Sequence, residues 1–366
     1  MLNRIKDVAK RLLAIVWIRR SYETLLRAGL EVLAANRMTS LLYSFLSIPS
    51  FNREQFATLR GRRDYYRNLG KDRQSRTELR RNIHRLEKGI LMRPRRAVFA
   101  LDYLIETIEF YERAVDQASS GNGGDDGEMD WAYSVLKQYF ATVDSDHPAV
   151  TEARARFRAT LAKFQAKDDR KVPYQRIHGA RSDVSYEDLL ALARQRRSVR
   201  WFEQKPVPRD LIDKALLVAR QSPSACNRLP YEFRVFDDPA LVATGASIPF
   251  GSAGYAHQVP AIAVVVGRLN HYFSPRDRHA IYVDSALASM AFMLSLETLG
   301  LASSVINWPD FEPLERKMGA TLNLDMDERV IMLIAIGYAD PEGMVAFSDK
   351  KSLDVIRSYN VIDRKH

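Results

Sequence analysis

Two short and almost uninterrupted apolar runs restrict the folds that this chain can adopt. Residues 261–267 read AIAVVVG, and residues 330–337 read VIMLIAIG. Both are rich in β-branched residues and are too short for a typical helix, so we expect central strands that are buried on both faces. Amphipathic or apolar helical patterns occur at 186–195, 209–221 and 280–299. A sheet with helices on both faces follows from this mixture of α and β elements.

The chain before this mixed region reads almost entirely as helix. A polar stretch at 167–183 follows these helices. Ser185 then offers an N-cap for the next helix, and Asp188 completes a weaker form of the capping box. We therefore predict a mostly helical N-terminal region over residues 1–184 and a second domain over residues 185–366.

The positive charge of the chain lies wholly in its first half. Residues 1–185 hold 34 Lys and Arg against 23 Asp and Glu, whereas residues 186–366 hold 21 against 22. Within the first half, residues 53–96 hold 15 basic and 5 acidic side chains. Such a run can contact nucleic acid or acidic lipid, or it can be the solvated face of a helix that buries its apolar stripe. No aromatic residues interleave the cations from His84 to Arg96 as a base-stacking surface requires, so we expect a solvated face and no nucleic-acid partner.

The apolar segment Leu12–Ile18 is too short for a membrane span, which takes about 20 residues. A core-facing helix is the favoured interpretation, and an amphipathic helix on an anionic membrane surface is the alternative. We expect a cytoplasmic protein, with peripheral membrane or protein contact through the basic N-terminal region left open.

The chain offers no recognisable metal site. Cys226 is the single cysteine, so neither an intrachain disulfide nor a cysteine-based metal centre can form. The histidines show no paired ligand spacing. The glycine-rich stretch 121–127 has neither a preceding strand nor a Gly-Lys-Ser/Thr ending, so it predicts a flexible loop and not a phosphate loop.

Two short segments of the second domain together suggest a bound mononucleotide. Three cations and a hydroxyl precede the helix at 209–221: Arg196, Arg197, Ser198 and Arg200. Guanidinium groups donate paired hydrogen bonds to phosphate oxygens, so this cluster suits a phosphate monoester. The turn at 222–227 follows that helix and offers backbone N–H groups and the Asn227 amide, which suit the carbonyls and ring nitrogens of a flavin.

These two segments resemble the motifs of the nitroreductase-like, FMN-dependent oxidoreductases. The first reads RRSVRWF and the second PSACNRLPYEF. YVDSALASMAFMLSLETLGLASSVINW is similar to the family's long interface helix and to the loop that lies against the flavin, and GYADPEG with SDKKSL is similar to its C-terminal part. The resemblance covers about residues 186–360. It implies an α+β, three-layer fold with a central mixed sheet, preceded here by the mostly α-helical N-terminal region.

The resemblance also implies an FMN site that is built across a homodimer interface. The arginine cluster and Ser198 would hold the phosphate and ribityl chain, and Lys350 and Lys351 would close on the phosphate. Pro223, Ser224 and Asn227 would reach the flavin of the partner subunit. The remaining implied contacts are backbone groups near the reactive edge of the ring: Val305, Ile306, Asn307 and Trp308.

The implied activity is reduction of an acceptor by NAD(P)H in a ping-pong flavin mechanism, with no catalytic side chain of its own because the flavin performs the redox step. The acceptor would be a nitro, quinone or enone-type compound. Phe250, Tyr255 and His257 are candidates for the wall above the flavin, although His257 can equally be a surface residue. Leu229 stands where the family usually has glutamine, which leaves open whether flavin affinity survives. Two alternatives therefore remain: a flavin-dependent synthase or oxidase that uses no nicotinamide, and a non-catalytic, membrane-associated partner protein with a degenerate flavin fold.

Overall fold

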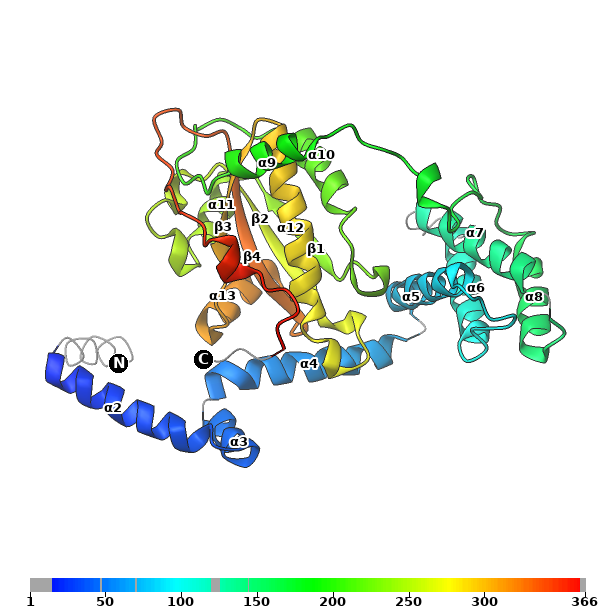
Figure 1. Ribbon diagram of the computed structural model, residues 1–366, viewed down its shortest axis with the longest axis horizontal. Helices are drawn as coiled ribbons and strands as arrows, with labels where there is room; N and C mark the ends of the chain where they lie inside the picture. The colour runs from blue at the N-terminus through cyan, green and yellow to red at the C-terminus, as the bar shows by residue number, and fades with distance from the viewer. Residues whose placement is uncertain (1–14, 47, 70, 120–125, 144, 363–366) are drawn as a thin grey trace.

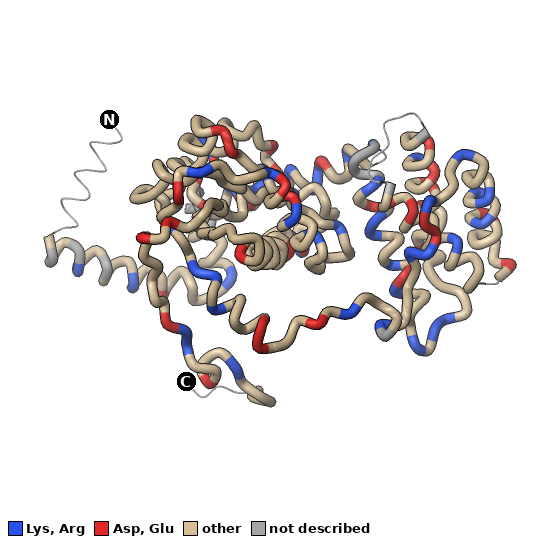
Figure 2. The backbone as a smooth tube through the Cα atoms, turned by 90° about the horizontal axis from the view of Figure 1, so that it is seen from above, with Lys and Arg blue, Asp and Glu red and all other residues tan. Residues whose placement is uncertain are grey.

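The computed structural model describes residues 15–46, 48–69, 71–119, 126–143 and 145–362. An α+β lobe and a separate helical lobe lie side by side along its longest axis (Figure 1). The chain passes from the helical lobe to the α+β lobe through one extended segment that carries both acidic and basic positions (Figure 2).

A four-stranded antiparallel sheet forms the centre of the α+β lobe, in the order β1-β2-β4-β3. The two apolar runs occupy its two inner positions, as predicted. All three strand pairs are antiparallel, and the parallel pairing between Ser198 and Ser303 is an isolated bridge outside the named strands. The bounds of the strands are β1 Tyr231–Phe236, β2 Ala261–Arg268, β3 Ala302–Asn307 and β4 Glu328–Gly337.

Helices cover both faces of this sheet, which confirms the α+β class and its three layers. Alternate residues of β2 enter two different cores: Ala263 and Val265 pack with α10 and α12, whereas Val264 and Val266 pack with α11 and α13. The shorter helix α9 contacts α12. The bounds are α9 Tyr186–Gln195, α10 Arg209–Ala219, α11 Pro239–Ala246, α12 Ala280–Thr298 and α13 Glu312–Leu322.

The start of α9 has the predicted capping box. Ser185 Oγ accepts a hydrogen bond from the Asp188 backbone N–H at 3.0 Å, and the Asp188 carboxylate accepts one from the Ser185 N–H at 3.3 Å. These bonds satisfy two amide donors that have no partner within the helix. They fix where α9 begins, and they therefore help to position the arginines that follow its C-terminal end.

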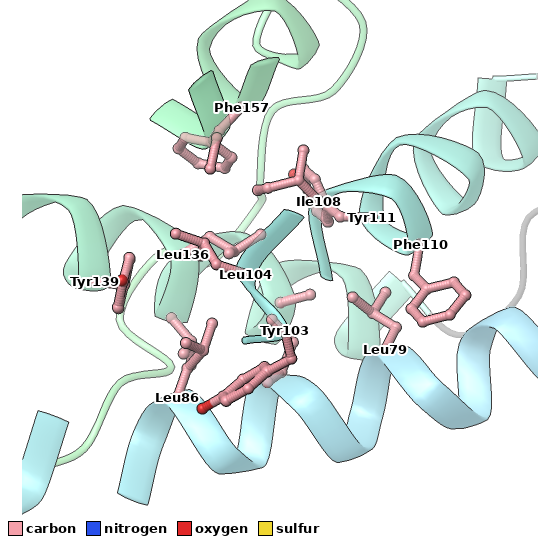
Figure 3. Close-up of a cluster of buried hydrophobic side chains, with 14 of the residues drawn as sticks. Leu79, Leu86, Tyr103, Leu104, Ile108, Phe110, Tyr111, Leu136, Tyr139 and Phe157 are labelled. Carbon is pink, nitrogen blue, oxygen red and sulfur yellow. The ribbon is translucent and has the colours of Figure 1, made fainter. Parts of the chain in front are cut away.

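The helical lobe has a hydrophobic core of its own. Side chains from its helices are completely buried against one another, and several of them, including Leu79, Leu86 and Leu136, are seen in Figure 3. The aromatic rings of Phe99 and Tyr139 meet edge to face, with centroids 5.1 Å apart. The helices are α5 Asp72–Leu91, α6 Leu104–Ser119, α7 Asp126–Thr142 and α8 Pro148–Thr160.

Helix α4 (Ile48–Asn68) precedes the helical lobe in the sequence but packs on the α+β lobe. Its Ala57 is fully buried in the core that also contains α10 and α12. Arg53 on α4 pairs with Glu315 at 3.1 Å and with Glu312 at 2.9 Å, both on α13. The predicted boundary near residue 184 remains a prediction, but part of the N-terminal region is structurally part of the second domain.

Many cations of the basic run 53–96 face carboxylates. Besides Arg53, these include Arg81, which donates to Glu78 at 3.0 Å, and Arg85, which lies 3.4 Å from Asp102. This arrangement is the salt-bridged helix face that the sequence favoured.

The helices α2 (Val16–Leu33) and α3 (Arg37–Leu46) extend away from the rest of the molecule (Figure 1).

One helical stretch in the described part of the chain, Pro275–Thr298, is long and apolar enough to cross a bilayer. Half of its most apolar window is buried inside the molecule, where α12 covers the sheet. The core helix of a globular domain meets the same criterion of length and composition, so the stretch is weak evidence for a membrane span.

Candidate functional site

The predicted cationic segment lies beside the edge strand of the sheet. Helix α9 ends at Gln195, and the chain then runs extended past β3, where the Val199 backbone N–H donates to Ser303 O at 3.1 Å. Phe202, further along, forms a bridge with Ala339 just beyond β4. These contacts fix the backbone on both sides of Arg200, so the side chains of this segment project from a supported chain.

Four of the predicted phosphate-binding residues line one small pocket of about 140 Å³ together with Lys350. The pocket brings together two segments that lie about 150 residues apart in the sequence. Its residues are Ala193, Arg196, Arg197, Ser198, Arg200, Ala346, Ser348 and Lys350. The lining includes four cationic side chains and no acidic one, so the pocket attracts anions.

Some hydrogen-bond donors in this pocket are used within the chain, and one buried donor is left over for a phosphate oxygen. Arg197 Nη2 donates to the backbone oxygens of Ala346, at 2.5 Å, and of Phe347, which ties the two segments together. Arg196 Nε is buried and donates to no acceptor in the part of the chain that the structure describes. A buried donor without an acceptor is unfavourable, and a phosphate oxygen would satisfy it. The residues present therefore fit the phosphate of FMN.

The predicted flavin-facing turn lies elsewhere in the same chain. It follows α10 and contacts α5 of the helical lobe, where Arg80 Nε donates to Asn227 O at 3.0 Å. The Ser224 hydroxyl accepts from the Leu229 N–H at 3.1 Å. Neither Pro223, Ser224 nor Asn227 lines the cationic pocket. One chain therefore does not unite the two halves of the predicted site.

Asp284 of α12 holds this turn in place. Its Oδ2 accepts the Ala225 backbone N–H at 2.9 Å and the Tyr272 hydroxyl at 3.3 Å. Burial raises the pKa of Asp284, and the hydrogen bond from Ala225 opposes that rise. Asp284 has the geometry of a residue that supports the turn.

The residues predicted to line the reactive edge alternate along the end of β3. Val305 is 39% exposed, whereas Ile306 and Trp308 are buried. The Trp308 indole N–H donates to Glu315 Oε1 at 2.5 Å, which fixes the ring against α13. Asn307 is exposed. Exposed residues therefore alternate with buried residues along this edge of the sheet.

The three candidate wall residues have different environments. Phe250 is 66% exposed, and its ring packs on that of Phe311 with centroids 5.7 Å apart. Tyr255 is buried in the core beneath α11. His257 is exposed, and its ring lies edge to face with Trp201 at 6.5 Å. Of the three candidates, Phe250 therefore presents an exposed phenyl ring, His257 presents an exposed imidazole, and Tyr255 is not available.

The structure adds three groups to the site that the sequence did not indicate. Ser348 and Ala346 line the cationic pocket, and the buried Ser303 hydroxyl beside Ser198 has no hydrogen-bond partner among the residues described. No local sequence signal marks them, because Ala346 and Ser348 are small residues of a C-terminal loop and Ser303 is a small residue within strand β3. Lys351 is exposed and lies outside the pocket lining.

Comparison with known proteins agrees with the motif resemblance. Residues 193–248 and 242–338 match the model of the Nitroreductase family. An "NADH dehydrogenase" of Thermus thermophilus is 26% identical over 187 residues, which cover 43% of this chain and 89% of that protein. Iodotyrosine deiodinase 1 of Pongo abelii is 20% identical over 215 residues, which cover 50% of this chain and 73% of its own. A solved FMN-dependent nitroreductase of Clostridium difficile R20291 covers 47% of this chain and 99% of its own, with 20% identity and a TM-score of 0.41.

The resemblance predicted from the sequence is thereby confirmed: the α+β lobe is nitroreductase-like and follows a helical N-terminal region. The family match covers less than half of the chain, and it supports an oxidoreductase of that type.

Proposed function

We propose that this protein is an FMN-dependent oxidoreductase that uses NAD(P)H to reduce a small acceptor in a ping-pong cycle. The observation that carries the proposal is the convergence of Arg196, Arg197, Ser198, Arg200 and Lys350 on one pocket, with a buried Arg196 donor left without an acceptor among the described residues. Bound FMN would supply the hydride chemistry. The family match and the name of the Thermus relative support the nicotinamide as donor.

In this proposal the chain's residues bind and orient. The guanidinium groups of Arg196 and Arg200 would neutralise the phosphate, and the Ser198 hydroxyl would add a donor. Arg197 has a different part, because its Nη2 already holds the C-terminal loop by two carbonyl oxygens. It would therefore position Lys350 beside the phosphate more than bind the phosphate itself. Lys351 would add only long-range attraction from its exposed position.

The proposed site needs two chains. Pro223, Ser224 and Asn227 lie away from the cationic pocket of their own chain, so they would approach the flavin of a second copy. Apolar side chains on α12 support such an interface: Val283, Leu287 and Met290 follow helical spacing and are 57%, 45% and 41% exposed. We infer that the protein acts as a homodimer.

The exposed ring of Phe250 favours a planar acceptor such as a nitroaromatic, a quinone or an enone. Phe250 and Phe311 together present an aromatic surface beside the end of β3. Aromatic side chains pack on conjugated rings in offset-stacked or edge-to-face arrangements.

The test is the double variant Arg196→Ala/Arg200→Ala. Two lost charge-assisted hydrogen-bonding groups should weaken FMN binding by about 100-fold or more. The purified variant should keep the circular dichroism spectrum of the parent and lose its flavin absorbance. The matched control is Arg194→Ala/Arg209→Ala, which removes two exposed arginines from α9 and α10 outside the pocket and should retain FMN. Full flavin occupancy in the first variant would refute the phosphate assignment.

A further inference from the structure

A second and larger cavity lies between the two lobes. Its volume is about 780 Å³, within the range of small-molecule sites, which is about 300 to 1,000 Å³. The walls come from α5 and α7 of the helical lobe, from residues 170–174, and from the end of α10 with the turn that follows it. This cavity shares no lining residue with the cationic pocket beside β3.

The charge of this cavity is predominantly positive. Five cationic side chains line it, against the two carboxylates of Glu87 and Glu128. Both carboxylates are engaged: Glu87 accepts from the Trp131 indole N–H at 3.0 Å, and Glu128 lies 3.6 Å from Arg80. The cationic side chains are those of Arg80, Arg170, Lys171, Arg220 and Arg228.

Three of these cations have protein partners. Arg80 pairs with Glu128 and also donates to the turn after α10. Arg170 pairs with Asp168 at 3.0 Å, and Lys171 donates to Gly127 O at 3.0 Å. Of the other two, Arg228 has only a long ion pair with Glu78, at 3.9 Å, and Arg220 has no hydrogen bond or ion pair with any residue that the structure describes.

Arg228 is the group that points to a ligand. Its side chain is only 4% exposed, yet its Nε and Nη2 donate no hydrogen bond to any residue that the structure describes. The nearest carboxylate oxygen, from Glu78, is 3.9 Å from Nη2, and the guanidinium lies over the Tyr272 ring at 5.0 Å. A buried guanidinium with free donors is costly unless an anion accepts from it.

Arg220 supplies a second free cation at the mouth of the same cavity. It is exposed at the C-terminal end of α10, and its side chain forms no hydrogen bond or ion pair with any described residue. Trp131 adds an aromatic surface to the wall, with the Arg80 guanidinium 5.4 Å from the ring. Flat conjugated molecules pack on such surfaces.

We propose that this interlobe cavity binds a planar organic anion, with Arg228 and Arg220 holding its charged group and Trp131 contacting its ring. The helical lobe would then be part of a ligand site and not only an appendage. None of Arg228, Arg220 and Trp131 lines the cationic pocket beside β3, but the cavity shares Asn227 with the turn that is proposed to reach the flavin of a second copy.

The test uses adenosine monophosphate as the planar anion and adenosine as its uncharged counterpart, titrated calorimetrically into the full-length protein. The titration is done in the Arg196→Ala/Arg200→Ala background, so that the phosphate pocket beside β3 does not contribute. We expect adenosine monophosphate to bind at least about tenfold more tightly than adenosine, because charge-assisted hydrogen bonds form only with the former.

Arg220→Ser and Arg228→Lys should each weaken adenosine monophosphate about tenfold and leave adenosine unchanged. Arg228→Lys retains the positive charge opposite Glu78 but removes the guanidinium group. If the Arg228→Lys protein fails to fold, Arg220→Ser still tests the site. Arg209→Ser, at the other end of α10, is the matched control and should have no effect. Equal affinity for the two probes, or a loss caused equally by the control, would overturn the proposal. Loss of flavin from the background variant has no bearing on this outcome, so the two proposals fail separately.

Discussion

Asp327, which precedes the central strand β4 by one residue in the chain, allows a quantitative test of the electrostatics of this fold. Its side chain is 3% exposed, and Oδ2 has no hydrogen-bond partner among the described residues. Burial, assisted by the nearby carboxylates of Asp64, Asp325 and Glu328, raises the pKa of Asp327 from an ordinary 3.8 to about 6. The folded protein therefore holds this proton more tightly than the unfolded chain does.

The sign of the pH effect follows from that difference. Stability contributed by this proton is fully present below pH 3.8 and is lost as the pH rises through about 6. Because one pKa unit corresponds to somewhat more than 1 kcal/mol, the loss reaches about 3 kcal/mol at pH 8 and about 2 kcal/mol at pH 5. Asp327→Asn removes the charge and nearly preserves the shape. We therefore expect the variant to exceed the parent in free energy of unfolding by these amounts.

The assay is equilibrium urea unfolding of parent and variant at pH 5 and pH 8, followed by circular dichroism. The difference between the two proteins isolates this one carboxyl, because other titrating groups are common to both. Asp213→Asn, an exposed aspartate on α10, should show no comparable difference between the two pH values. If the Asp327→Asn variant has no advantage at pH 8, or a larger advantage at pH 5 than at pH 8, the reasoning is refuted.

Two further predictions concern packing. Glu315→Ala removes the acceptor of the Trp308 indole and the carboxylate beside buried Arg329, so we expect a loss of about 3 to 5 kcal/mol in urea unfolding. Glu312→Ala, which removes a more exposed partner of the same α4–α13 contact, should cost about 1 kcal/mol or less; equal losses would contradict a buried network. Leu86→Ala empties a fully buried position in the helical lobe and should destabilise that lobe by about 2 to 5 kcal/mol. Flavin content of the folded Leu86→Ala variant should stay that of the parent, and its loss would show that the helical core supports the cofactor site directly.

The sequence was most informative where a local pattern determines a local structure. The apolar runs at 261–267 and 330–337 could be assigned to central strands because only burial on both faces accommodates such composition. The capping box at Ser185 could be predicted because it involves four consecutive residues. The RRSVRWF segment specified a cluster of donors, but the partner segment around Lys350 came from the family resemblance and not from spacing.

Other features depend on contacts that no short pattern encodes. The resemblance implies a loop against the flavin after the long helix, yet residues 302–307 form the edge strand β3, because they pair with β4. The free donors of Arg228 emerge only when the helical lobe packs against the turn after α10. Burial of Asp327, too, depends on surroundings that include Asp64 of α4, more than 250 residues earlier.

The position of α4 changes how the helical lobe should be regarded. The Gly61 backbone of α4 leaves so little room that an added Cβ would lie 2.7 Å from the Leu269 Cβ, just after β2. The chain thus leaves the oxidoreductase body after α4, builds the helical lobe, and returns at α9. The lobe is consequently an insertion tethered at both ends, and any swing it makes must use two attachment points. To delete the lobe, residues 69 and 185 would have to be joined by a short linker. An N-terminal truncation would also remove α4, which packs on the α+β lobe.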